Sequence, residues 1–171
     1  MSLFTRILKA VYNEVRKPAS FVRGEEFEQY LRNEIFTQLY YDIDHRSHDY
    51  SVNHNDYVGD SMFPDFIFCE YKSERLFAVE AKYRSYFYED AVEWCKPRQL
   101  ARYKDFSTHM PTLVALGVGG EPKYPDHLYI FNVASVKYPK LFKKTLKPYE
   151  VKVDHEVQPG FLWKKLVSKN G

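Results

Sequence analysis

Cysteine is scarce in this chain of 171 residues, which contains only Cys69 and Cys95. Two thiols cannot build a disulfide framework, and they are too few to hold an iron–sulfur cluster, which usually takes four. We therefore expect two reduced thiols, buried as small apolar side chains, in a cytoplasmic protein.

Long apolar runs are also lacking. No stretch approaches the roughly 20 apolar residues that span a bilayer, so no membrane partner is expected. Arg6 and Lys9 interrupt the N-terminal stretch, which therefore lacks the apolar core of a signal peptide. Gly119 and Gly120 are not followed by the Gly-Lys-Ser/Thr of a phosphate-binding loop, and no internal repeat or low-complexity segment occurs.

A strong net charge is lacking too, since the chain carries only +2 at pH 7. Residues 134–171 contain nine Lys, no Arg and three acids, a net of +6, so residues 1–133 sum to −4. A basic end beside an acidic body is typical of a protein that contacts phosphate in one region and binds metal in another. An ordinary Lys-rich surface would give the same pattern. The candidates for phosphate contact here are Lys140, Lys143 and Lys144.

Apolar residues are plentiful, at 44% of the chain, with aromatics at 18%. This composition excludes a disordered chain, and the length suffices for one compact domain with a real core. Asp65 follows Pro64 and opens an apolar run at 66–69, which a polar turn at 71–75 separates from a second run at 76–79. Two short apolar runs around a polar turn predict a β-hairpin.

The second run ends in Glu80-Ala81-Lys82. Because residues two apart in a strand share a face, Glu80 and Lys82 project together, and hairpin pairing brings Asp65 close to Glu80. Two carboxylates and the Ala81 carbonyl can hold Mg²⁺ or Mn²⁺, which would activate water and neutralise charge during phosphodiester hydrolysis. Lys82 can orient the water or stabilise the developing charge. A solvated salt bridge at the end of a hairpin is the alternative explanation.

A helix is predicted over residues 24–39, because apolar residues recur at helical spacing. Its buried stripe consists of four residues spaced four apart, Phe27, Leu31, Ile35 and Leu39. Glu28 and Glu34 both lie at the margin of this stripe. On geometry alone they are equal candidates for a third carboxylate.

Other segments before the hairpin have weaker patterns. Residues 2–17 predict an amphipathic helix that Pro18 ends, residues 41–45 alternate as a strand, and residues 49–60 are polar and turn-rich. The spacing of three nearby histidines matches no usual zinc-ligand pattern. These are His45, His48 and His54.

A further helix is predicted between Pro97 and Pro111. Gln99 and Tyr103 lie on its apolar face, where a Gln needs a hydrogen-bond partner, for which a main-chain group would suffice. Arg98 and Arg102 lie on the adjacent face and could hold phosphate. Arg84 belongs to an aromatic and basic loop that could stack on unpaired bases or simply cover the sheet.

The remaining segments predict two buried strands, at 112–118 and 128–133, then a short helix at 135–146 and an irregular, Lys-rich remainder. The order of elements is helix, strand, hairpin, helix, strand, strand. This order predicts an α/β domain with a central mixed β-sheet flanked by α-helices.

These motifs resemble the PD-(D/E)XK nuclease superfamily, which has the restriction-endonuclease-like fold. The matching residues are Pro64-Asp65 and Glu80-Ala81-Lys82. Gly24-Glu25-Glu26-Phe27-Glu28 looks like the first-helix pattern of the family, and Gln99-Leu100-Ala101-Arg102-Tyr103 looks like the Gln-x-x-x-Tyr motif of the recombination-nuclease and Cas4-like branch. With only two cysteines the chain departs from the Cas4-like branch, so only the helix motif carries over.

The resemblance spans residues 24–133, and the chain is expected to be a single nuclease-like domain with an N-terminal helix within 1–20 and a Lys-rich extension at 134–171. It implies a metal-dependent nuclease acting on DNA, with Mg²⁺ or Mn²⁺ as cofactor, and it favours Glu28 over Glu34. The implied metal-binding residues are Asp65, Glu80, Ala81 and Glu28, and Lys82 and Gln99 would complete the catalytic set. The candidates for nucleic-acid contact are Arg84, Arg98, Arg102, Tyr103 and the three lysines.

Two other hypotheses remain open at this stage. The chain could be a nucleic-acid-binding or interaction module that keeps the fold without turnover, or an unrelated α/β protein with an accidental match. The intact Asp65, Glu80 and Lys82 favour the nuclease. Cutting of both strands would favour a homodimer, for which residues 134–171 are a candidate interface.

Overall fold

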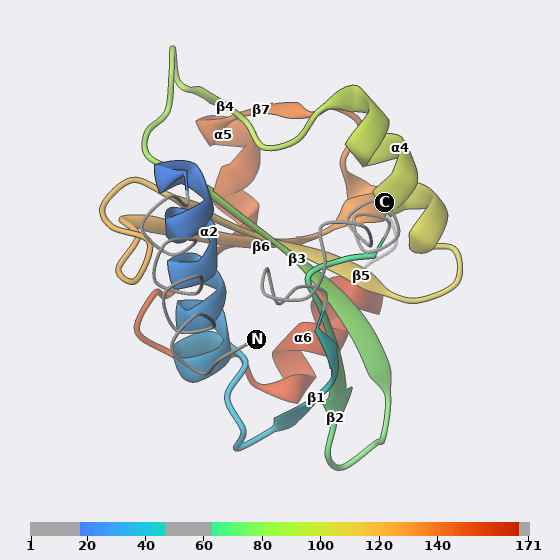
Figure 1. Ribbon diagram of the computed structural model, residues 1–171. Coiled ribbons are helices and arrows are strands. Elements are labelled where there is room, and N and C mark those ends of the chain that lie inside the picture. The colour runs from blue at the N-terminus through green and yellow to red at the C-terminus, as the bar shows by residue number, and fades with distance from the viewer. Residues whose placement is uncertain (1–17, 47–62, 168–171) are drawn as a thin grey trace, which may run out of the picture.

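We analysed the protein in a computed structural model, which describes residues 18–46 and 63–167 (Figure 1). The helix predicted at 2–17 and the polar stretch predicted at 49–60, with His48 and His54, lie outside the described residues. The predicted strand at 41–45 is confirmed.

A six-stranded mixed sheet forms the centre of the fold, in the order β1-β2-β3-β5-β6-β8. Its strands are β1 (Tyr41–Arg46), β2 (Phe66–Glu70), β3 (Leu76–Arg84), β5 (Thr112–Val118), β6 (His127–Asn132) and β8 (Glu150–Val151). Only the pair β3–β5 is parallel within this sheet. Two further strands, β4 (Ala91–Glu93) and β7 (Lys140–Phe142), pair as a separate antiparallel ribbon.

The helices lie on both faces of the sheet (Figure 1). They are α2 (Ala19–Tyr30), continued by the π-helical turn η1 (Leu31–Ile35), then α4 (Pro97–Phe106), α5 (Lys143–Leu146) and α6 (Pro159–Val167). Two 3₁₀ turns, η2 (Val133–Ser135) and η3 (Lys147–Tyr149), complete the set. None of the helices in the described ranges is long and apolar enough to cross a bilayer.

Each face of the sheet has its own hydrophobic core. Leu113 and Ala115 of β5 pack with α2 and α6, whereas Val114 and Leu116 pack with α4, α5 and the β4–β7 ribbon. Because β5 is buried on both faces, it needs an almost unbroken apolar sequence, as predicted. Cys95 is also buried, and burial raises the pKa of its thiol to about 11, whereas Cys69 is half-buried.

The predicted hairpin is confirmed as β2 and β3, which pair antiparallel with Phe66 opposite Val79. β3 is longer than β2, so its last residues pair only with β5. Within residues 18–46 and 63–167, no strand covers the β2 side of β3 from Glu80 to Arg84. The sheet therefore has a notch at the end of the hairpin where Asp65 and Glu80 lie.

The first core helix differs from its predicted bounds. It begins at Ala19, after Pro18, and ends at Ile35. Its last turn is π-helical, with the Phe36 N–H donating to the Leu31 carbonyl, and the wider turn delays the stripe by one residue. Phe36 is buried, whereas Leu39 lies beyond the end of the helix and is 65% exposed, so the prediction that Leu39 is buried is wrong.

The C-terminal segment is also more regular than predicted. The prediction of a short helix at 135–146 is wrong for most of that segment. The chain there forms the end of η2, then β7, and only then the helical turn α5. The remainder adds β8 to the edge of the sheet and ends in α6. Leu162 of α6 is buried in the core, and Trp163 packs edge-on against Phe77 of β3.

Candidate active site

Asp65 lies directly before β2, one step beyond the Phe66–Val79 pair, and so faces the end of the hairpin where β3 continues. Its Oδ2 accepts the Ala81 N–H at 2.7 Å. This bond replaces the ladder contact that β2 would have made, and it fixes the carboxylate against β3. The antiparallel pairing of Phe66 with Val79 sets Asp65 opposite Glu80, as predicted from the hairpin.

Glu80 and Lys82 project to the same face of β3, as the two-residue period predicts, and the Lys82 ammonium contacts Glu80 Oε1. The Tyr103 hydroxyl of α4 donates to the same oxygen. Tyr103 is itself held in the core, where its ring stacks on Trp94. Glu80 is thus only 3% exposed and fixed by two donors.

The electrostatics of this cluster favour an added cation. Burial raises the pKa of Asp65 well above its usual range, and the Glu80 charge adds to the effect. Burial alone would lower the pKa of Lys82, but Glu80 and Asp65 together raise it above the ordinary value. Burial also raises the pKa of Glu28, against the opposing effect of Arg46. The three carboxylates Asp65, Glu80 and Glu28 outnumber the cations Lys82 and Arg46 in a partly desolvated place, so binding of a proton or of a metal cation lowers the electrostatic cost.

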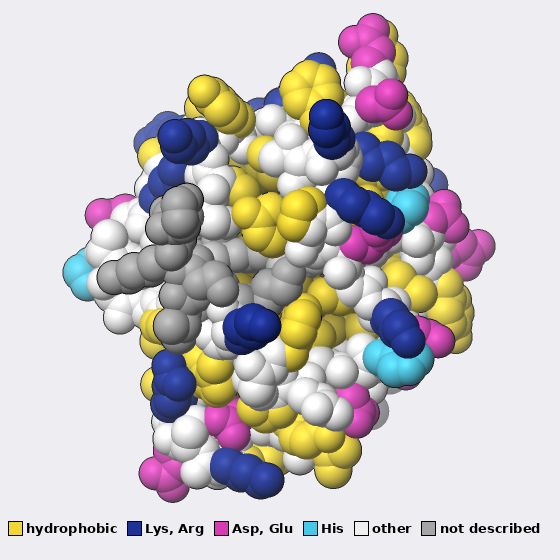
Figure 2. Space-filling view, turned by 180° about the vertical axis from the view of Figure 1, so that it is seen from behind, with side chains coloured by type: hydrophobic (Ala, Val, Ile, Leu, Met, Phe, Trp, Pro, Cys, Tyr) yellow, Lys and Arg dark blue, Asp and Glu magenta, His cyan; other side chains and the backbone are white. Residues whose placement is uncertain are grey.

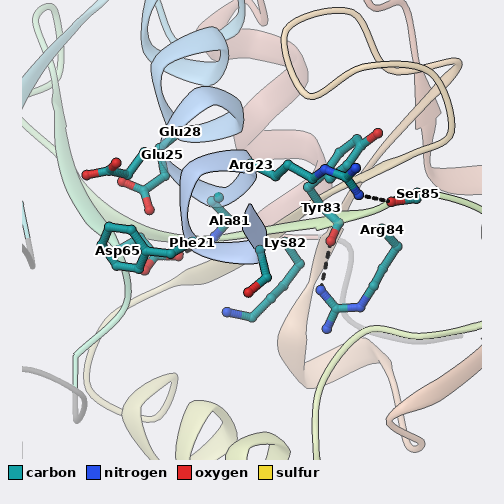
Figure 3. Close-up of a pocket in the computed structure, with 12 residues that line it drawn as sticks. Phe21, Arg23, Glu25, Glu28, Asp65, Ala81, Lys82, Tyr83, Arg84 and Ser85 are labelled. Carbon is teal, nitrogen blue, oxygen red and sulfur yellow. Dashed lines mark hydrogen bonds between the residues drawn. The ribbon is translucent and has the colours of Figure 1, made fainter. Parts of the chain in front are cut away.

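A pocket of about 410 Å³ opens at the notch, between the first turns of α2 and the uncovered edge of β3 (Figure 3). It is lined by five of the sequence-predicted residues, namely Glu28, Asp65, Ala81, Lys82 and Arg84. Glu28 is bridged to Arg46 at 3.5 Å. Its rival Glu34 is exposed and does not line the pocket.

Gln99 is not part of this cluster. It lies in the first turn of α4, where its side-chain oxygen accepts the Lys96 N–H at 2.9 Å. This is the main-chain alternative that the sequence left open, and it keeps Gln99 out of the pocket lining. Tyr103 is only 1% exposed and donates to Glu80. Tyr103 is therefore placed to orient the Glu80 carboxylate, and its buried side chain has no surface for contact with nucleic acid.

The basic residues predicted to contact nucleic acid differ in how they are held. Arg84 lines the pocket, but its guanidinium donates to the carbonyls of Glu93, Trp94 and Tyr83 at 2.7–2.8 Å. Arg98 is exposed on α4, and Arg102 lies with its guanidinium carbon 5.1 Å from the centre of the Tyr103 ring.

The three predicted lysines, Lys140, Lys143 and Lys144, are exposed on β7 and α5. Lys143 Nζ lies 3.2 Å from His127 Nε2, which ties it to the end of β6. On the face seen in Figure 2, Lys and Arg side chains lie in several separate places among apolar and acidic ones. Phosphate contact by these lysines stays a prediction.

Arg23 and Ser85 are among the polar residues of the pocket that sequence reasoning missed. Arg23 Nη1 donates to Ser85 Oγ at 2.9 Å, across 62 positions of sequence. The predicted helix began at residue 24, so Arg23 fell outside it. Its signal was its place four residues before Phe27, on the same side of a helix that in fact starts at Ala19.

The donor set fits a hard divalent cation. Among the residues in the described ranges, no three His, Cys, Asp or Glu side chains converge as a ready-made metal group. Two carboxylates and a carbonyl do meet, because the Ala81 N–H points to Asp65 and the carbonyl of a strand residue points the same way as its N–H. Mg²⁺ commonly binds through one or two carboxylates and keeps several waters.

No protein-family model and no curated protein matches the sequence. A solved structure with a similar fold is that of Hjc, a Holliday junction resolvase from the archaeal hyperthermophile Archaeoglobus fulgidus, with a TM-score of 0.52. The match covers 77% of this chain and 97% of that chain, at 15% sequence identity. This similarity confirms the predicted fold class, an α/β domain of restriction-endonuclease-like architecture.

Proposed function

We propose that the protein is a divalent-metal-dependent nuclease that hydrolyses phosphodiester bonds of DNA. The observation that carries the proposal is the meeting of Asp65, Glu80 and Lys82 at an open notch of the sheet, beside a pocket. Support for DNA comes from the fold shared with a protein that resolves Holliday junctions. A homodimer and a cytoplasmic location stay predictions.

Asp65, Glu80 and the Ala81 carbonyl would hold Mg²⁺ or Mn²⁺. Asp65 uses one carboxylate oxygen for the Ala81 N–H, and Glu80 uses one for Lys82 and Tyr103. Within residues 18–46 and 63–167 no hydrogen bond uses the second oxygen of either carboxylate, which leaves it for a cation. When bound, such a cation supplies an acidified water and neutralises charge on the phosphate.

Lys82, Tyr103 and Glu28 each have a separate role beside the cation. Lys82 stays protonated, because the neighbouring carboxylates hold its pKa above the ordinary value, so it acts as a fixed positive charge toward the phosphate and not as a base. Tyr103 keeps Glu80 in one orientation through its hydroxyl. Glu28, bridged to Arg46, contributes negative charge at the wall of the pocket.

The second candidate is a DNA-binding module without turnover. It is favoured by one observation, namely that a third carboxylate does not converge on Asp65 and Glu80 in the described part of the chain. In that case Asp65 and Glu80 would shape the pocket, and the basic side chains around it would contact phosphate.

A cleavage assay separates the two candidates. Wild-type protein is mixed in excess with single-stranded, duplex, overhanging and four-way-junction DNA, in Mg²⁺, Mn²⁺ or Ca²⁺. A nuclease cuts at least one DNA in Mg²⁺ or Mn²⁺ and loses this activity in Asp65→Asn, whereas Lys72→Ala, at the far end of the hairpin, serves as the control. Binding without cutting by the wild type in every metal would establish the second candidate.

A further inference from the structure

The pocket has two chemically different ends (Figure 3). Asp65 and Glu28 lie at one end, to the left of the helix α2 in the view. Arg23 and Ser85 lie at the other end, where the close-up shows them joined by a hydrogen bond. Under the proposed function the acidic end would bind the metal, and the Arg23–Ser85 end has no assigned role.

The Arg23–Ser85 end offers hydrogen-bond donors. Arginine has five N–H donors, and the hydrogen bond to Ser85 Oγ at 2.9 Å uses one of them. Residues 18–46 and 63–167 supply no carboxylate within ion-pair distance of Arg23. Both side chains are exposed, so a ligand entering the pocket reaches them without moving the fold.

This donor set matches a phosphate group. A guanidinium presents a planar fork that fits two phosphate oxygens, and a neighbouring hydroxyl adds a third donor. The wall between the two ends is also positive, since Lys82 and Arg84 line it. Although Arg84 donates to main-chain carbonyls, its charge still acts on an anion in the pocket.

The two ends of the pocket are too far apart along β3 to contact the same phosphate. Ala81 and Ser85 are four residues apart, about 13 Å along an extended strand. One step of a nucleic-acid strand advances only about 3.4 Å along a duplex. Arg23 is tied to Ser85 at that distance, so it would contact a different phosphate from the one beside a cation at Asp65 and Glu80.

We propose that Arg23, supported by Ser85, binds a backbone phosphate at a fixed distance from the one that is cut, and so positions the strand in the active site. The proposal rests on the nuclease function above and adds a second phosphate site to it. Arg23 acts through the position of the strand, so its loss weakens DNA binding more than it slows the chemical step at saturating enzyme.

Salt dependence of binding gives the first test. Affinity is measured in Ca²⁺ at several salt concentrations, on the DNA that wild type cuts fastest. Arg23→Ala should flatten the log–log slope by about 0.9 on duplex or about 0.7 on a single strand, the value of one lost contact. Arg23→Lys should restore most of the slope, and Lys72→Ala, which removes a positive charge at the far end of the hairpin, should match wild type.

A neutral phosphate gives the sharper test. A single methylphosphonate is placed at successive positions of the cut strand, and binding and single-turnover cleavage are measured for wild type and Arg23→Ala. One position, away from the cut, should weaken wild-type binding and have no further effect on Arg23→Ala. At saturating enzyme, the single-turnover rate of Arg23→Ala should fall by a smaller factor than its DNA affinity.

Failure of this site and failure of the nuclease proposal look different. If wild type cuts DNA but Arg23→Ala has the wild-type salt slope and the wild-type methylphosphonate profile, the second phosphate site is wrong and the nuclease stands. If wild type cuts nothing yet Arg23→Ala loses one phosphate contact, the contact stands and the nuclease is wrong. A wild-type protein that binds no DNA contradicts both.

Discussion

Each end of the β2–β3 hairpin contains a buried or half-buried carboxylate, and the pKa values of the two carboxylates are shifted in opposite directions. At the turn, Glu70 is 4% exposed, and its oxygens accept from the Ser73 hydroxyl, the Lys72 N–H and Trp163 Nε1. The Ser73 hydrogen bond lowers the pKa of Glu70 despite burial. At the notch, burial and a neighbouring carboxylate raise the pKa of Asp65.

The difference lies in the supply of donors. The turn provides three for one carboxylate, so Glu70 is satisfied by the protein alone. In the described part of the chain, Asp65 at the notch accepts one main-chain N–H, and both donors to Glu80 contact the same carboxylate oxygen. Neighbouring carboxylates with few hydrogen-bond donors repel each other, and a bound cation relieves this repulsion. The turn end therefore has a structural role, and the notch is suited to bind a cation.

The largest expected effect is on catalysis at the notch. Lys82→Ala removes the charge that acts on the transition state, so single-turnover cleavage in Mg²⁺ should fall by ~10²–10³, about 3–4 kcal/mol. DNA binding in Ca²⁺ should change little. Lys72→Ala, at the turn end, should cut at the wild-type rate. Wild-type cleavage by Lys82→Ala would contradict the role of this residue.

The next effect is on stability at the turn. Glu70→Gln replaces charged hydrogen bonds with neutral ones and should lower the free energy of unfolding by about 1–2 kcal/mol. Since the pKa of Glu70 in the folded protein lies below its ordinary value of 4.5, its contribution is present above that value and is lost as pH falls through the lower folded pKa. Urea unfolding should thus show the largest gap between wild type and Glu70→Gln near neutral pH. A gap that grows on acidification would contradict the comparison.

A smaller effect is expected when Glu80 loses one of its two donors. Tyr103→Phe keeps the buried ring and its stacking on Trp94 but removes the hydroxyl. One hydrogen bond of about 1.4 kcal/mol corresponds to a roughly tenfold slower cleavage step. Single-turnover kinetics at saturating enzyme measure it. A loss seen only in DNA affinity would instead place Tyr103 in substrate binding.

The smallest expected effect is on the stability of the metal-free protein, and its sign is opposite to that expected for Glu70→Gln. Asp65→Asn relieves the repulsion between Asp65 and Glu80, so without metal its melting temperature should equal or exceed that of wild type. The expected rise is about 2 °C, less than 1 kcal/mol for a chain of this length. Differential scanning calorimetry in EDTA measures it. A drop as large as that of Glu70→Gln would mean that both ends of the hairpin are structural.

The hairpin and its carboxylates were predictable because their signal is local. Apolar runs of strand length fix β2 and β3, and the two-residue period alone places Glu80 beside Lys82. The buried strand β5 is also a local signal, because both of its faces are covered. Glu28, in contrast, could not be separated from Glu34 until the direction of α2 over the sheet was known.

The rest depended on contacts that a local pattern does not contain. Gln99 is held by a bond at the start of its own helix, which competes with any long-range role. The π-helical turn that ends the first core helix before Leu39 has no clear sequence signature. The pair Arg23–Ser85 joins residues 62 positions apart, and β8 and α6 are fixed by packing on the sheet.

The most direct test of the account is a titration with Mn²⁺, in which free Mn²⁺ is followed by electron paramagnetic resonance. Wild type and Glu70→Gln should bind the ion with similar affinity, whereas Asp65→Asn and Glu80→Gln should bind it far more weakly. This result would place the cation at the notch and leave the turn with its structural role. Equal Mn²⁺ binding by all four proteins would contradict a metal site at Asp65 and Glu80.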